Sequence, residues 1–248
     1  MTDAKAEILS RIRAALGSDG DAGAPSQAAV PRGYRSAGEH APGSDAVLDL
    51  LIDRLEDYKA HVHRATPEQV PELLARLVER PVTEQSVERH EVGSPGYRSP
   101  DVLPTTQQTD GRRSVVVPTG LDPAWLGGLG QVEVRTDSHD APLSAAELDE
   151  VDTVVTASRV AVAETGTIVL DGGSDQGRRA ISLVPDVHVC VVRAAQVVQT
   201  VPEAVRLLGT DPARPLTWIS GPSATSDIEL DRVEGVHGPR TLHVVLVS

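Results

Sequence analysis

The chain has 248 residues, of which 40% are hydrophobic and 24% charged, and its formal net charge is −13. This composition is typical of a soluble globular protein, and the length suffices for a sizeable core. The negative charge argues against nucleic-acid and anionic-membrane partners, because such a surface repels phosphate groups.

The N-terminal residues do not resemble a secretion signal, because Asp3, Lys5 and Glu7 interrupt any apolar run. No apolar stretch reaches the roughly 18 residues of a membrane span. We therefore expect a cytoplasmic protein. Its single cysteine, Cys190, can supply neither an internal disulfide nor the ligands of an iron–sulfur cluster. We expect no cofactor and no metal in this chain.

The N-terminal part of the sequence predicts, in chain order, a helix, a linker and the start of a domain. Apolar residues at helical spacing predict a helix within residues 1–17. The Gly-, Pro- and Ser-rich tract of residues 18–44 predicts a mobile linker. Residues 45–248 are then expected to form one α/β domain, in which Asp45 opens the first helix and residues 71–80 form the next.

The remainder alternates short apolar stretches with capped helices. Capping boxes beginning at Ser144 and Thr200 predict two helix starts. Several apolar stretches lack a period of two, which indicates strands covered on both faces and hence a three-layer α/β fold. The expected strands are residues 114–118, 131–135, 151–156, 160–163, 167–170, 180–184, 187–193, 216–220 and 242–247.

Glu164 stands in the sequence VAVAETGTIVL, where two apolar stretches meet at a Thr165-Gly166 turn. Ligands of α/β sheets bind at strand ends. A carboxylate at this turn could therefore act as a base, as a nucleophile or as an acceptor for substrate hydroxyls. The alternative is a strand-end glutamate bonded only to backbone amides, and the residues alone leave both open.

A second candidate site lies in the sequence SGPSATSDIE. A strand ends in a Gly-Pro turn, and Ser223, Thr225 and Ser226 follow where a helix is expected to begin. Free backbone amides beside hydroxyls can bind a carboxylate or a phosphate. Plain helix capping is the alternative. His237, on the turn GVHGP, could face the same site or could only stabilise its turn.

Two further groups of side chains are candidates for a functional site. His188 and Cys190 are two residues apart on an expected strand and share a face, so a zinc site with His237 and His243 is conceivable. No metal-binding motif supports it, and buried structural residues are the favoured interpretation. Arg178 and Arg179 follow a Gly-rich loop and could reach a ligand carboxylate, although such pairs are more often solvated.

Four motifs occur in the order VAVAETGTIVL, LVPDVHVCVV, SGPSATSDIE and GVHGPRTLHVVLV. Together they resemble the LUD-domain family, in its lactate-utilisation protein C branch (LutC, YkgG-like). The resemblance is strong over about residues 150–248 and weaker over residues 45–150. It implies a Rossmann-like sheet similar to the NagB/RpiA/CoA-transferase fold.

The resemblance also implies a role in oxidising L-lactate to pyruvate, as a non-redox subunit without activity alone. The implied partners are LutA-like and LutB-like subunits, which carry the iron–sulfur clusters. This chain would then bind a small carboxylate or organise those partners. The alternative is a free-standing enzyme similar to CoA-transferases or sugar-phosphate isomerases that uses Glu164. Against it, no CoA-binding motif is recognisable and the acidic surface disfavours a polyanionic substrate.

Overall fold

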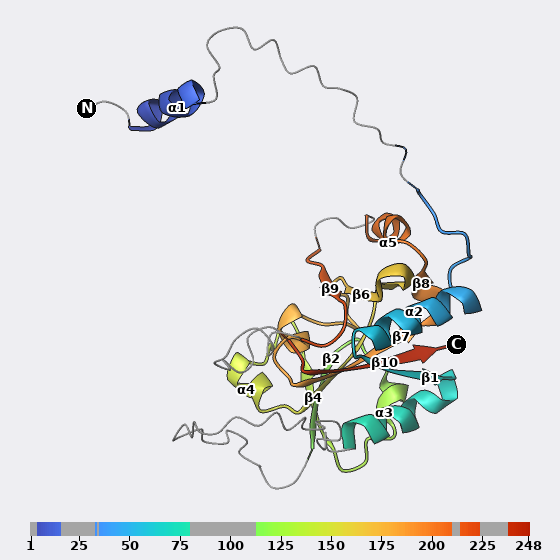
Figure 1. The fold of residues 1–248 in the computed structure, drawn as a ribbon. Coiled ribbons are helices and arrows are strands. Elements are labelled where there is room, and N and C mark those ends of the chain that lie inside the picture. The colour runs from blue at the N-terminus through green and yellow to red at the C-terminus, as the bar shows by residue number, and fades with distance from the viewer. Residues whose placement is uncertain (1–3, 16–32, 34, 80–112, 210–213, 224–237) are drawn as a thin grey trace, which may run out of the picture. The chain divides into compact units, whose positions relative to one another are not determined.

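The computed structural model describes residues 4–15, 33, 35–79, 113–209, 214–223 and 238–248. The chain forms two compact units, Met1–Arg35 and Ser36–Ser248. The first contains helix α1 (Ala4–Ala15), whose apolar residues Ile8 and Ile12 are exposed. The second contains all the other helices and strands that the structure describes (Figure 1).

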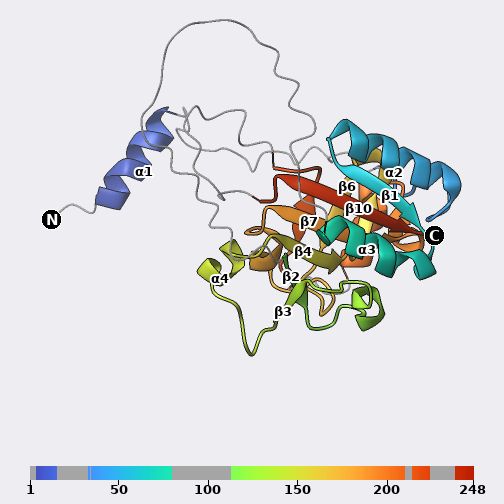
Figure 2. The ribbon, with the colours of Figure 1, turned by 90° about the horizontal axis from the view of Figure 1, so that it is seen from below.

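A six-stranded sheet forms the centre of the second unit. Its strand order is β1-β10-β7-β4-β2-β3, and every neighbouring pair is parallel (Figure 2). This confirms the predicted α/β class. The strands are β1 (His61–Ala65), β2 (Ser114–Pro118), β3 (Glu133–Asp137), β4 (Thr153–Ala157), β7 (Val187–Arg193) and β10 (Thr241–Val247).

Helices cover both faces of this sheet, as Figure 1 shows for α2 (Asp45–Asp57) and α3 (Val70–Glu79). Val189 and its neighbours at every second position of β7 pack with Leu74 of α3 and with Trp125 of the 3₁₀ helix η2 (Pro123–Leu126). The intervening positions, including Cys190, pack with Leu51 of α2. The near-continuous apolar sequence of β7 reflects this double coverage.

A second, four-stranded sheet lies on the α2 side, in the order β8-β5-β6-β9. Its strands are β5 (Val160–Val162), β6 (Thr167–Leu170), β8 (Val197–Val198) and β9 (Thr217–Ile219). Ile168 faces the core that α2 shares. Val169 faces the other way, toward Ala204 of α5 (Val201–Leu208).

The capping boxes are confirmed. In the first, Ser144 precedes α4 (Ala145–Asp149), and its backbone N–H donates to the Glu147 carboxylate over 2.8 Å. In the second, Thr200 precedes α5, and its N–H donates to the Glu203 carboxylate, also over 2.8 Å. Both carboxylates therefore satisfy an amide at a helix start.

One predicted strand is absent from the structure, and an observed strand was not predicted. Residues 180–184 do not form a strand: the 3₁₀ helix η4 (Arg179–Ser182) occupies this place, with Ile181 in the core. A short apolar run cannot distinguish a helix from a strand by its pattern. Strand β1 was not predicted, because its sequence HVHRA has few strand-forming residues.

Part of the predicted linker contacts the domain. Gly43 N–H donates to the Val197 carbonyl and His40 N–H to the Gln199 side chain, each over 2.9 Å. Most of residues 18–44 lie outside the described residues, so the predicted boundaries after residues 17 and 44 stay predictions. Of the helices within the described ranges, none has the length and apolar character needed to cross a bilayer.

Candidate functional site

The turn that carries Glu164 closes an antiparallel hairpin between β5 and β6. It consists of the 3₁₀ helix η3 (Ala163–Thr165) followed by Gly166, whose φ is 57°. A Cβ atom at Gly166 would lie 2.8 Å from Cβ of Arg54 on α2. The left-handed backbone and the close approach to α2 both require glycine here, so the turn is held in one position.

Gln199 forms two hydrogen bonds with Glu164. Its Nε2 donates to Oε1 of Glu164 over 3.2 Å, and the Glu164 N–H donates to its carbonyl over 3.0 Å. Gln199 is itself buried, and its side-chain oxygen is held by His40. The half-buried carboxylate is therefore fixed in place, which suits a structural glutamate as well as a positioned catalytic one. Its role stays a prediction.

A chain of hydroxyl groups leads from this turn to β9. Oγ1 of Thr165 lies 2.8 Å from Oγ1 of Thr167, which lies 2.8 Å from Oγ of Ser220. Ser220 directly follows β9, whereas Gln199 directly follows β8, at the opposite edge of the same sheet. The Glu164 turn and the SGPS segment are thus connected, whereas the hydrogen bond between Glu164 and Gln199 lies toward the other edge of the sheet.

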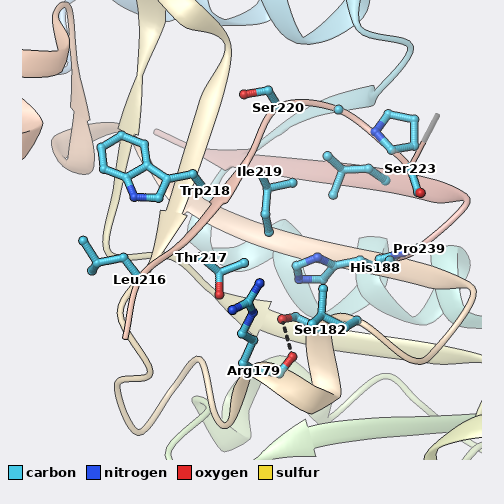
Figure 3. A pocket seen from close by; sticks show the side chains of 15 residues that line it. Arg179, Ser182, His188, Leu216, Thr217, Trp218, Ile219, Ser220, Ser223 and Pro239 are labelled. Carbon is cyan, nitrogen blue, oxygen red and sulfur yellow. Dashed lines mark hydrogen bonds between the residues drawn. The ribbon is translucent and has the colours of Figure 1, made fainter. Parts of the chain in front are cut away.

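A pocket of about 260 Å³ lies beside the SGPS segment (Figure 3). It is enclosed by η4, by β9 with the residues that follow it, and by the first residues of β7 and β10. Ile219 and Leu242 contribute apolar walls. The polar or aromatic side chains used below are Arg179, Ser182, His188, Thr217, Trp218 and Ser223.

This pocket lies at different ends of the strands that border it. The pocket follows the carboxyl end of β9, but it lies at the amino ends of β7 and β10, where His188 and Leu242 are second residues. The cause is a long-range contact: Ser223 N–H donates over 2.8 Å to the carbonyl of Pro239, just before β10. Glu164 is not among the residues that line the pocket.

The adjacent residues Arg178 and Arg179 have different roles in the structure. Arg178 donates to both carboxylate oxygens of Asp137, over 2.9 and 2.5 Å, and the Asp137 side chain is fully buried. Hydrogen bonding to Asp137 raises the pKa of Arg178. Arg179 has no ion pair within the described parts of the chain, and its side chain extends from η4 toward Thr217 and His188 (Figure 3).

His188 and Cys190 are buried on one face of β7, as expected. His243 lies on the opposite face, since its partner across β10 and β7 is Val189, and it contacts His63 instead. It cannot join the other two around a metal. In the ranges that the structure describes, no group of three or more His, Cys, Asp or Glu side chains is placed to hold a metal ion.

Of the other predicted site residues, Thr165 is exposed, Gly166 is buried against α2, and Ser223 lines the pocket. Thr225, Ser226 and His237 lie outside the described residues. Sequence reasoning did not select Trp218 or Ser182 for the pocket. An exposed tryptophan on a short strand was the available signal for Trp218, which is 43% exposed.

Comparison with known proteins identifies the family. The sequence model of the LUD domain matches residues 48–247. The chain belongs to the LUD-domain family. A crystal structure of a DUF162 family protein from Deinococcus radiodurans superposes with a TM-score of 0.59 at 37% identity, covering 82% of this chain and 97% of that one. The predicted fold class is thereby confirmed.

Curated relatives carry the name "Lactate utilization protein C". The protein from Deinococcus radiodurans is 56% identical over 138 residues, which are 55% of this chain and 63% of that protein. The Bacillus subtilis protein is 34% identical over 40% of this chain and 44% of its own length. These two matches each span less than two thirds of the relative. The protein from Oceanobacillus iheyensis is 25% identical over 82% of both chains.

Proposed function

We propose that this LUD-domain chain is a cytoplasmic, non-redox subunit of a system that oxidises L-lactate to pyruvate. Its partners in the proposal are LutA-like and LutB-like iron–sulfur subunits. The observation that carries the proposal is the 56% identity to a protein named for lactate utilisation. The LUD-domain match over residues 48–247 supports it over a longer stretch.

The non-redox part of the proposal rests on the chain's own side chains. A cluster needs several thiolates, and this chain has one cysteine. Cys190 of β7 is buried, and burial raises the pKa of its thiol to about 12. A thiol that stays protonated is a poor ligand and a poor nucleophile. Electrons from lactate would therefore pass through the partner subunits.

The pocket beside η4 supports a contribution by this chain to substrate binding. Arg179 supplies a positive charge that has no ion pair in the described ranges of the chain, and the hydroxyl groups of Ser182 and Thr217 lie near it (Figure 3). A volume of about 260 Å³ suits a small organic acid, and it lies below the usual size of a site for a nucleotide cofactor. We therefore place the proposed carboxylate here. In the other form of the proposal the chain only organises its partners.

A CoA-transferase-like or sugar-phosphate-isomerase-like enzyme remains the second candidate. The observation that favours it is the fixed turn of Glu164 at the carboxyl end of β5, held by Gly166 and Gln199. A catalytic carboxylate needs such positioning. This second candidate is disfavoured because Glu164 does not line the pocket. The Glu164 carboxylate and the Arg179 guanidinium would then act at different places.

Deletion of the gene tests the proposal. The deletion strain should fail to grow on L-lactate as sole carbon source and should grow normally on glucose, and a wild-type copy should restore growth. Normal growth on lactate, with no second lactate dehydrogenase present, would refute the proposal. A Glu164→Gln copy separates the candidate roles at nearly constant volume. It should restore growth if Glu164 is structural, and it should fail, with the complex assembled, if the carboxylate acts on substrate.

A further inference from the structure

An exposed apolar face lies on the side of the four-stranded sheet that points away from α2. Val169 of β6 packs with Ala204 of α5 on this side, whereas the preceding Ile168 points toward α2. Trp218 of β9 is the antiparallel partner of Val169, so its side chain lies on the same side of the sheet as that of Val169. Val169 is fully buried and Trp218 is 43% exposed. The cover that α5 gives to this sheet therefore stops before β9.

Exposed apolar side chains continue along this outer layer. Apart from Tyr58 and Val134, the exposed large hydrophobic side chains in the described parts of the second unit all lie on α5, on β9 or on the residue before β9. They are Val201, Val205, Leu207, Leu216 and Trp218, and together we call them the outer apolar face. Val201 and Val205 are one helical turn apart, and Leu216 is two residues before Trp218, so each pair shares a side of its segment. Figure 1 shows α5 beside this sheet, on the side away from α3.

Strand β9 separates the outer apolar face from the pocket. Ile219 packs in the core on the α2 side and extends toward His188 in Figure 3, whereas the ring of Trp218 extends away from His188. Leu216 and Trp218 nevertheless border the pocket. A molecule bound on the outer apolar face would therefore contact the strand that forms one wall of the pocket.

The face, rather than the edge of β9, is the surface that suits a partner. Within the described ranges β9 ends the four-stranded sheet, and it has three residues, between Pro215 and Pro222. Short edge strands and nearby prolines hinder the addition of a further strand. Helix α5 instead presents an exposed apolar surface against which a second helix can pack.

The charges of this region indicate which partner the face fits. The net charge of the chain is −13, so two copies repel each other electrostatically. Residues 215–223 include no charged side chain, and α5 has one of each sign, Glu203 and Arg206, which attract each other. A like-charged second copy can approach at this neutral face. A basic partner would instead be drawn to acidic parts of the surface.

The size of the outer apolar face also fits an interface between two copies. Its five residues are between 37% and 51% exposed. They offer roughly 300 Å² of apolar surface for burial in each copy. A standard interface buries about 800 Å² per partner, with a mainly apolar centre and a polar rim. The face is large enough to form that centre, and Arg206, which is exposed on α5, would lie at the rim.

We propose that the chain forms a symmetric dimer through the outer apolar face, in which α5 of one copy packs on α5 and β9 of the other. A two-fold axis lets the same face serve both copies, so no second complementary surface is needed. The inference does not depend on the proposed function. It adds a contact that would hold β9, and with it one wall of the pocket, in place.

Sedimentation velocity of the full-length purified chain tests the dimer. We expect a dissociation constant of about 10 μM or below, within the range of standard-size interfaces. Val205→Glu puts an unpaired charge into the face at an exposed helical position, where glutamate is well tolerated, and should weaken the dimer at least about a hundredfold. Val134→Glu, the same change on the exposed strand β3, should leave the dimer unchanged. A wild-type chain that stays monomeric well above this concentration overturns the inference, even if another segment of the chain or a different protein covers the face.

Tryptophan fluorescence locates the contact independently of any substitution. The chain has two tryptophans, of which Trp125 is buried in the core and Trp218 lies on the outer apolar face. Raising the protein concentration should shift the emission to shorter wavelength and reduce quenching by acrylamide, because the dimer removes the ring of Trp218 from water. Val205→Glu, with its fold checked by circular dichroism, should stay quenchable at every concentration. A wild-type dimer as quenchable as the monomer, or a folded Val205→Glu that dimerises like the wild type, would place the contact elsewhere and contradict the proposal.

Discussion

Nε2 of His63 and Nδ1 of His243 lie 3.2 Å apart on the neighbouring strands β1 and β10. The ring of His61 stacks on that of His243, with centroids 5.0 Å apart. Burial, followed by the nearby His61 and His63, lowers the pKa of His243 to about 4. Burial and the nearby Arg76 also lower the pKa of His63. Protonation of His63 or His243 in the folded protein is therefore unfavourable.

We predict that the domain loses stability below about pH 6.5. The folded-state pKa values of His63, His188 and His243 lie below the ordinary value, so the unfolded chain binds more protons in acid. Their contribution is present above pH 6.5 and is lost as the pH falls toward 4. Each titrating histidine changes the free energy of unfolding by at most roughly 1.4 kcal/mol per pH unit.

Urea unfolding at a series of pH values from 7.5 to 4.5 measures this slope. A His243→Gln variant removes one titrating ring from the cluster and should flatten the slope while lowering stability at neutral pH. A variant with the same slope as the wild-type protein would show that His243 is not responsible.

Arg178→Gln and Arg179→Gln form a matched pair of adjacent changes. The first leaves the buried carboxylate of Asp137 without its partner and should lower the free energy of unfolding by about 2 kcal/mol or more. The second removes a charge with no ion pair in the described structure and should change stability by less than about 0.5 kcal/mol. Equal losses, measured by urea unfolding at pH 7.5, would contradict the division of roles.

Gly166→Ala should distort the turn that carries Glu164. The new Cβ meets Arg54 at 2.8 Å in a backbone conformation that disfavours L side chains. We expect a loss of about 1–3 kcal/mol in the free energy of unfolding. Gly127→Ala is the control, because φ there is −61° and the closest atom to the added Cβ would be 3.5 Å away. A loss at Gly127 as large as at Gly166 would show that the cost is not specific to this turn.

The purified chain should be colourless. With one buried cysteine and no dinucleotide-binding fingerprint in its sequence, it has no evident means of holding a cluster or a flavin. Absorbance between 350 and 500 nm that follows the protein through purification, or stoichiometric iron by elemental analysis, would be the contrary result.

Local features were predictable from the sequence. The capping boxes at Ser144 and Thr200 bond as expected, and Glu164 lies on a turn between two strands. Such features depend on residues a few positions apart. The continuous apolar sequence of residues 187–193 also predicted that β7 is covered on both faces, because alternate side chains of a strand point to opposite faces of the sheet.

The pocket was not predictable in the same way. It depends on the contact of Ser223 with Pro239 and on the packing of η4 against β9, which join distant parts of the chain. The same holds for the pairing of Arg178 with Asp137, 41 positions apart. The contact of Thr156 with His188 also needs the register of β4 against β7, which no local pattern specifies.

Reconstitution of the lactate-oxidising system tests the central claim most directly. The measurement is the L-lactate-dependent reduction of an artificial electron acceptor by the purified LutA-like and LutB-like subunits, with and without this chain. The proposal predicts a rate that requires all three proteins, with none from this chain alone. Full activity of the two iron–sulfur subunits without it, or oxidation of lactate by this chain by itself, would contradict the assignment as a required non-redox subunit.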